Sequence, residues 1–444
     1  MPTPSIAVTE CDASPPGAKK RQMFVPALRA VLARTLGPAG SFLLTLILAR
    51  ALGAEGTGTF YVTLTLVTGC ALLAKFGLDT ALQRFVGAAA GAGDIGQVTG
   101  IYRQALRIVG LLSLAIGSGC FMLAPAIAER LLHDPAQATL VQVMAMSIVP
   151  FSLLGVHSAM LKAVGKPAWG GFFEAAAWPV LTVSLVLAAL LSNELSVRSV
   201  AVSYLFAALL SLFSGYLVLK RQMPGNTRAV PIPSPALYAS CLPLVAVELM
   251  NYALLWMPFL LLPVFTDAGE AGLYNVSHRL AAQLGLLMAV FSSIASPRFS
   301  AYFQQGNDRE LRRLAIHSSR SMLLFGLPPA LLLLIWSDPV LSVFGSEFAA
   351  AAEVLRILVI GQLVNLAAGP VGYLLAMTGQ ERTLRNVLIV TSLITLPLSL
   401  LLIPAYGAVG AAWSVTLPMI FHNLACSLIL SKRLNLPLIL ISAR

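Results

Sequence analysis

The sequence predicts an all-α polytopic membrane protein, and three observations lead to that prediction. Apolar residues make up 58% of the 444 residues, whereas charged residues make up only 11%, and the mean hydropathy is +0.84. A soluble chain carries about 25% charged residues, so this one could not cover a water-exposed surface. The apolar residues also gather in runs of about 20 or more, the length that crosses a bilayer as a helix. Finally, these runs lack the alternating pattern of a membrane β-barrel.

Twelve apolar runs are long enough to span a membrane. We expect transmembrane helices at residues 26–50, 56–77, 104–127, 138–163, 169–192, 197–219, 236–262, 271–295, 316–337, 351–377, 383–404 and 407–431. They are predicted to form two six-helix bundles, at 24–222 and 236–433, joined by a cytoplasmic linker at 223–235. Residues 1–23 and 434–444 are expected to be cytoplasmic tails, and the first is expected to be disordered because it is polar and rich in proline.

The distribution of lysine and arginine predicts the orientation of these helices. If the N-terminus lies in the cytoplasm, 23 of the 29 Lys and Arg residues fall on the cytoplasmic side. The opposite side receives only Arg50, Arg130, Arg198 and Arg356. Because cytoplasmic loops are enriched in these residues, both termini are expected to be cytoplasmic. The net charge of +11 therefore reflects membrane topology and does not indicate nucleic-acid binding.

The sequence lacks the motifs that would indicate an enzyme or a cofactor. The five cysteines are far apart, with no CxxC or Cys/His cluster for a metal site. There is no phosphate-binding loop sequence for ATP and no Asp-x-Asp pair for a nucleotide sugar. The predicted loops are also too short to hold a polymerase site. We therefore expect neither catalysis nor a cofactor, and a membrane glycosyltransferase or polymerase is the least favoured interpretation.

The two halves of the chain repeat one pattern. A constant offset of 214 residues pairs Gly58 with Gly272, Val62 with Val276, Arg84-Phe85 with Arg298-Phe299, Asp94 with Asp308, Pro125 with Pro339, Leu161 with Leu375 and Gly165 with Gly379. Each repeat holds six predicted helices, an even number, so both repeats have the same orientation. They would be related by a pseudo-twofold axis along the membrane normal, and transporters of this kind bind substrate at the repeat interface. We expect alternating access by rocking of one bundle against the other.

Ionisable residues inside the predicted helices mark the candidate site. Arg34 and Glu248 occupy the same position in the two repeats and would form a charge pair across the axis. A charge at mid-membrane costs about 2.5–3.5 kcal/mol, so it normally faces a cavity or a partner. The alternative is that one or both side chains reach the cytoplasmic interface. Glu248 and Glu174 are also the carboxylates placed to couple transport to protons or sodium, although Glu174 lies near a helix end and could simply be hydrated.

Two polar stripes complete the predicted substrate-binding set. In each, spacings of three, four and eight residues place the members on one face of a helix. The stripes are Glu248, Asn251, Tyr252 and Trp256 in the seventh predicted helix, and Asn275, His278, Arg279 and Gln283 in the eighth. A guanidinium beside amide and imidazole groups suits a diphosphate or a sugar. The alternative is a polar helix–helix contact that only holds the bundle together.

Three stretches resemble the oligosaccharide flippases of the multidrug/oligosaccharidyl-lipid/polysaccharide (MOP) exporter superfamily. They are LARALGAEGTGTFY at 48–61, FGLDTALQRF at 76–85, and the segment 155–167 that ends the fourth predicted helix in Gly-Lys-Pro. The resemblance implies a MATE/MOP-like fold with a central cavity between two bundles. It also implies flipping of undecaprenyl-diphosphate-linked oligosaccharides across the bacterial cytoplasmic membrane. Membrane lipids and other polysaccharide assembly proteins would be the partners, and Arg34 and Arg279 would meet the anionic headgroup.

One alternative within the same superfamily stays open. A drug–cation antiporter would need buried carboxylates as a proton or sodium switch, and Glu248 and Glu174 are the available candidates. The lipid II flippases belong with the first interpretation, but such proteins usually have two helices more than are predicted here.

Overall fold

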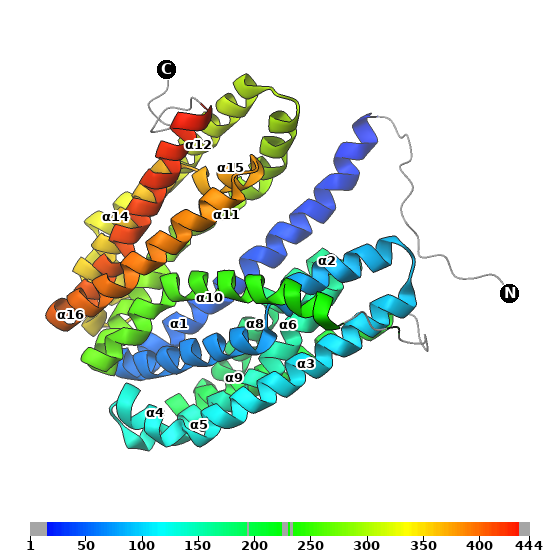
Figure 1. The fold of residues 1–444 in the computed structure, drawn as a ribbon. Coiled ribbons are helices and arrows are strands. Elements are labelled where there is room, and N and C mark those ends of the chain that lie inside the picture. Colours follow the sequence, from blue (N-terminus) through cyan, green and yellow to red (C-terminus); the bar gives the residue numbers. More distant parts are fainter. Residues whose placement is uncertain (1–15, 193–194, 224–229, 231–233, 435–444) are drawn as a thin grey trace. The chain divides into compact units, whose positions relative to one another are not determined.

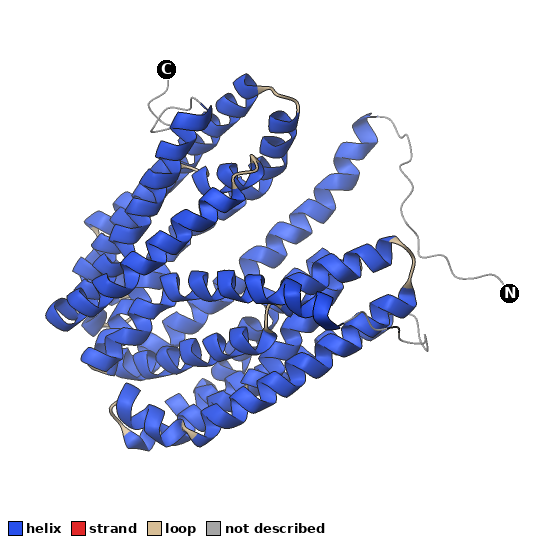
Figure 2. Ribbon diagram, viewed as in Figure 1, coloured by secondary structure: helices blue, strands red, loops and turns tan. Residues whose placement is uncertain are grey.

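The computed structural model describes residues 16–192, 195–223, 230 and 234–434. Within these residues the regular secondary structure is entirely helical (Figure 2), which confirms the all-α fold class. Most of the predicted tails and linker lie outside the described residues. The first helix begins at Pro16, inside the segment 1–23 that the sequence predicts as a tail.

Every predicted apolar run lies in helical segments of the structure (Figure 1). The first half contains α1 (Pro16–Lys75), α2 (Leu78–Gly91), α3 (Ile95–Met122), α4 (Ala124–Leu131), η1 (Pro135–Gln137), α5 (Ala138–Met146), α6 (Ile148–Ala163), α7 (Pro167–Ala175), α8 (Ala177–Leu191) and α9 (Val197–Gln222). The second half contains α10 (Ser234–Phe265), α11 (Ala268–Gln304), α12 (Asp308–Ile335), α13 (Ser337–Ser342), η2 (Ser346–Ala351), α14 (Ala352–Ala368), α15 (Val371–Met377) and α16 (Glu381–Leu434).

Several of these helices are suited to a bilayer. In the described part of the chain, 8 helical stretches are long and apolar enough to cross a membrane, and α7 with α8, bent by 44°, would add one more span. Large apolar side chains are also exposed along them, including Leu111 at 70%, Leu191 at 88% and Leu401 at 70%. A water-soluble protein would bury such side chains or use them as an interface. The protein is therefore a multi-pass membrane protein, as the composition predicts.

Two of the longest helices, α1 and α16, contain a sharp break at a glycine. Gly53 has φ 69° and ψ −172°, and Gly407 has φ 53° and ψ −130°. Glycine adopts positive φ without the steric cost that other residues have. At each break a carboxylate accepts a hydrogen bond from the amide of the next residue, Glu347 at 2.9 Å in α1 and Glu270 at 2.7 Å in α16. Each break thus ends one apolar run and starts the next, with the new helix N-terminus capped from another element.

The chain forms two compact units, and each unit is built from three separate segments of the sequence. Unit 1 contains the chain up to Leu44, Val67–Leu123 and Gln142–Ala246, and unit 2 contains Thr45–Leu66, Ala124–Val141 and Val247 onward. Unit 2 therefore includes both sides of the break at Gly53, together with most of the second half of the chain. The bundles predicted at 24–222 and 236–433 stay a prediction.

Each unit has its own apolar core. In unit 1, α6 packs against α2 and α3, and Leu82, Ile101 and Val156 are completely buried between them. In unit 2, α11, α12, α15 and α16 bury Phe299 and Leu374. These cores hold the helices that carry the candidate site and the crevice described below.

Candidate functional site

The second half of α1 crosses α11 at two paired glycines in unit 2. A methyl group on Gly58 would overlap the backbone carbonyl of Ala268, and a methyl group on Gly272 would overlap that of Ala54. The two contacts are equivalent in the repeat, because Gly272 follows Gly58 by 214 residues and Ala268 follows Ala54 by the same number. Only a residue without Cβ lets two helix backbones approach so closely. The predicted pseudo-twofold relation is therefore visible in the backbone of this crossing.

Polar residues follow the crossing at the next turns of both helices. Tyr61 and Asn275 are equivalent in the repeat, and each is 1% exposed. The guanidinium carbon of Arg279 lies 4.1 Å from the centre of the Tyr61 ring, and its Nε donates to Oδ1 of Asn275 at 2.9 Å. The Tyr61 hydroxyl shares a hydrogen bond of 2.8 Å with the hydroxyl of Thr45. We call these four residues the Arg279 cluster.

The Arg279 cluster orients the guanidinium and leaves its outer edge available. Among the described residues, neither terminal nitrogen of Arg279 has a hydrogen-bond partner, and no carboxylate lies within 4.0 Å of it. The contacts with the Tyr61 ring and the Asn275 amide fix the plane of the guanidinium. The cation–π contact with the ring stabilises this arrangement by about 0.5–2 kcal/mol. A planar fork of two donors matches the oxygens of a phosphate or diphosphate. A cation without a carboxylate partner inside a membrane protein is a candidate functional position.

An aromatic row continues from this cluster along α10 and α11. It consists of Tyr252, Trp256, Phe259, Tyr274 and His278. Trp256 lies 5.5 Å from His278, which stacks on Tyr274 at 5.8 Å, and Tyr274 stacks on Phe259 at 5.9 Å. The hydroxyl of Tyr252 donates to the carbonyl oxygen of Thr65, the residue equivalent to Arg279 in the first repeat. A cation beside flat aromatic faces suits a ligand that has both an anionic group and rings.

The structure brings together part of the predicted site. Tyr252, Asn275, His278 and Arg279 belong to the Arg279 cluster or the aromatic row. Gln283 folds back on its own helix, where its amide donates to the carbonyl oxygen of Arg279 at 3.2 Å.

The remaining predicted residues on α10 and α1 are Glu248, Asn251 and Arg34. Glu248 is partly buried on α10, and Asn251 is exposed. The side chain of Arg34 lies outside the described part of the structure. Its charge pair with Glu248 therefore stays a prediction.

Sequence reasoning missed Tyr61 and Thr45. A tyrosine and a threonine inside an apolar run look like ordinary packing residues, so the sequence pattern does not place either of them in the substrate site. The repeat carried the signal that could have found Tyr61, because it occupies the position of Asn275 in the first half.

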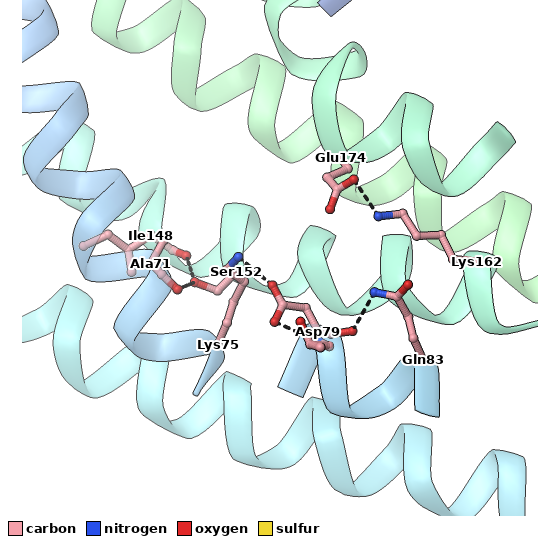
Figure 3. A network of polar contacts seen from close by, with 9 residues as sticks. Ala71, Lys75, Asp79, Gln83, Ile148, Ser152, Lys162 and Glu174 are labelled. Atoms are coloured by element: carbon pink, nitrogen blue, oxygen red, sulfur yellow. Dashed lines mark hydrogen bonds and ion pairs between the residues drawn. The ribbon is translucent and has the colours of Figure 1, made fainter. Parts of the chain in front are cut away.

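Glu174 lies in unit 1 on α7, and Figure 3 shows its carboxylate directed at Lys162. The two charged groups are 2.6 Å apart, and the side chain of Glu174 is 57% exposed. Ion pairs with this exposure contribute about 0–1 kcal/mol. The geometry resembles the hydrated carboxylate of the alternative interpretation, and a coupling role for Glu174 stays a prediction.

The sequence matches two protein-family models. The family described as "Polysaccharide biosynthesis protein" matches residues 30–303, and the MatE family matches residues 246–401. Among curated proteins, the probable low-salt glycan biosynthesis flippase Agl15 of Haloferax volcanii is 23% identical over 405 residues. That alignment covers 88% of this chain and 79% of the archaeal protein.

Solved structures share the fold. An inward-facing multidrug resistance MATE family transporter of the MOP superfamily matches with a TM-score of 0.72 at 13% identity, covering 91% of this chain and 98% of that one. The lipid II flippase MurJ in an inward closed conformation matches with a TM-score of 0.70 at 14% identity, covering 91% of this chain and 87% of that one. The MATE/MOP-like architecture predicted from the sequence is confirmed.

Proposed function

Because the chain belongs to the polysaccharide biosynthesis protein family and has the fold of a MOP-superfamily transporter, we propose that it flips an undecaprenyl-diphosphate-linked oligosaccharide across the bacterial cytoplasmic membrane. The oligosaccharide would then be exported or assembled into a cell-surface polysaccharide. Both termini would lie in the cytoplasm, as the distribution of lysine and arginine predicts. Other polysaccharide assembly proteins would be its partners.

The observation that carries this proposal is the available guanidinium fork of Arg279. A lipid diphosphate has closely spaced oxyanions that can accept two parallel N–H bonds from such a fork. Tyr252 and Trp256, which are partly exposed members of the aromatic row, offer flat apolar faces on which the first sugar rings would lie. One strong anionic contact with many weak neutral ones would bind the carrier firmly and tolerate different sugars.

The glycine crossing supports an alternating-access mechanism. Gly58 and Gly272 place no side chain between the backbones of α1 and α11. The angle between these helices can therefore change without repacking of side chains at the crossing. Since the Arg279 cluster lies only one to two turns away on the same helices, such a change would alter the site directly.

The proposal is tested in a strain from which the gene for this chain is deleted. We expect diphosphate-linked oligosaccharide to accumulate, because synthesis continues while translocation stops, and the wild-type gene should relieve the accumulation. Extraction of lipids and mass spectrometry of the carrier-linked sugars measure this. If no such lipid accumulated and the strain became sensitive to cationic drugs, the proposal would be contradicted in favour of a multidrug antiporter.

The antiporter is the second candidate, because the MatE family matches residues 246–401, which include Glu248, and a MATE transporter shares the fold. Proton or sodium coupling in either function would need a carboxylate that changes its charge. We expect Glu248→Gln to reduce transport in proteoliposomes and to remove its dependence on the proton or sodium gradient. Glu353→Gln is the matched control, since Glu353 is exposed on α14. Normal transport by Glu248→Gln at every pH and sodium gradient would exclude coupling through this residue.

A further inference from the structure

Unit 1 contains an apolar crevice bordered by α3, α6 and α9, which we call the unit 1 crevice. Its volume is about 490 Å³, and its apolar walls are Leu106, Leu153, Leu209, Leu212 and Phe213. Phe213 is 61% exposed and Leu209 is 45% exposed, although both lie in the middle of a helix long and apolar enough to span a membrane. The crevice therefore opens to the bilayer, and an occupant would come from the lipid.

Buried polar groups at and behind the inner side of the unit 1 crevice have no hydrogen-bond partner among the described residues. His157 lines the crevice and is only 4% exposed, and Tyr102 packs against it with ring centres 6.0 Å apart. The ring centre of Tyr216, also in the lining, lies 6.1 Å from that of the imidazole. Among the described residues, neither Nδ1 of His157 nor the hydroxyl of Tyr102 has a hydrogen-bond partner. Buried polar groups are normally satisfied, so a small movement of either side chain toward the crevice would let an incoming polar atom satisfy it.

The depth of these groups indicates which part of a lipid they would meet. Tyr102 lies near the start of α3, whereas His157 and Tyr216 lie near the ends of α6 and α9. Each is about six or seven residues from its helix end, which at 1.5 Å per residue is about 9–10 Å. If these helix ends lie at the outer edge of the polar layer, which is several ångströms thick, the three side chains lie just inside the hydrocarbon core, beside the ester-linked ends of the acyl chains.

Two basic residues lie beside the polar end of the unit 1 crevice. Lys220 lies one turn beyond Tyr216 on the same face of α9, and Arg103 lies one turn before Leu106 on α3. Both are exposed, and no carboxylate of the described residues pairs with either. Lys220 thus lies closer to its helix end than Tyr216, whereas Arg103 lies at the level of Tyr102.

We propose that the unit 1 crevice binds an anionic phospholipid. Its phosphate lies near Lys220 and Arg103, an ester oxygen meets the imidazole of His157 with Tyr102 behind it, and one acyl chain lies against Leu212 and Phe213. This site is built from residues of unit 1 alone and is different from the Arg279 cluster, which is built from residues of unit 2. It goes beyond the proposed translocation function, because the lipid is a bound component of the protein rather than its cargo.

The test is native mass spectrometry of the purified full chain in detergent, titrated with phosphatidylglycerol or phosphatidylcholine. We expect wild-type protein to retain one phosphatidylglycerol in preference to phosphatidylcholine. His157→Phe keeps the ring but removes the polar atoms, and Leu212→Trp fills the crevice, so each should weaken retention about tenfold. Lys220→Gln should reduce the preference for the anionic lipid.

Tyr373→Phe is the control, because Tyr373 is an exposed tyrosine of unit 2. It should retain the lipid like the wild type. Size-exclusion profiles identify any variant that does not fold. Because His157→Phe removes polar atoms and Leu212→Trp adds volume, a folding defect in one variant leaves the other as a valid test. Wild-type retention by both folded variants, or equal retention of the two lipids by the wild type, would overturn the proposal.

Discussion

Replacement of Gly58 or Gly272 by alanine is expected to destabilise the protein strongly. In each variant the new Cβ would overlap a backbone carbonyl of the partner helix, and backbone cannot rotate away as a flexible side chain can. The crossing of α1 and α11 must therefore widen. Overpacking of this kind costs about 1–3 kcal/mol, and more where backbone must shift. Thermal melting of the detergent-purified variants, followed by fluorescence or size exclusion, measures the loss.

Gly110→Ala is the matched control for the glycine crossing. Gly110 lies inside α3, and a Cβ at this position meets nothing within 4 Å. Alanine is favoured over glycine in a helix by about 1 kcal/mol, so this variant should melt at the wild-type temperature or above it. The close crossing would be disproved if Gly58→Ala and Gly272→Ala melted like Gly110→Ala. Because the two glycines are equivalent in the repeat, we also expect their effects to be similar.

Arg279→Ala is expected to weaken binding of the lipid diphosphate strongly while the protein stays folded. A hydrogen bond to a charged group contributes about 1.5–3 kcal/mol, and two parallel bonds from one fork would be lost together. This predicts binding that is weaker by about a hundredfold or more. Arg279→Lys keeps the charge but loses the planar fork, so it should recover only part of the affinity. Titration with a fluorescent lipid diphosphate and complementation of the deletion strain both measure the effect.

Two further variants separate the role of Arg279 from a general effect of charge or packing. Arg309→Ala removes an exposed arginine at the start of α12 and should bind and complement like the wild type. Tyr61→Phe keeps the ring under the guanidinium and loses only the hydrogen bond to Thr45, so a small effect is expected. If Arg279→Ala complemented as well as Arg309→Ala, the Arg279 cluster would not be the substrate site, although the flippase function would stand.

The sequence by itself determined the class of the protein, its membrane location and its internal repeat. These properties depend on local composition and on the order of residues, since the energy of placing about 20 apolar residues in a bilayer hardly depends on their neighbours in space. The offset of 214 residues also identifies Gly58 and Gly272 as an equivalent pair without any knowledge of the α1–α11 crossing. Of the two polar stripes, the stripe on α11 predicted more of the candidate site, since Asn275, His278 and Arg279 all belong to the Arg279 cluster or the aromatic row.

Only the tertiary structure decided which residues meet. Hydropathy could not show that α1 and α16 break at Gly53 and Gly407, because a break needs a positive φ and a carboxylate supplied from another element. The assignment of Tyr61 to the site depended on the approach of two helices whose sequences are far apart. The pairing of Glu174 with Lys162 was likewise invisible, since an ion pair is defined by the distance between side chains. Side-chain contacts between distant segments depend on how helices cross, and in this chain the α1–α11 crossing depends on two residues that lack a side chain.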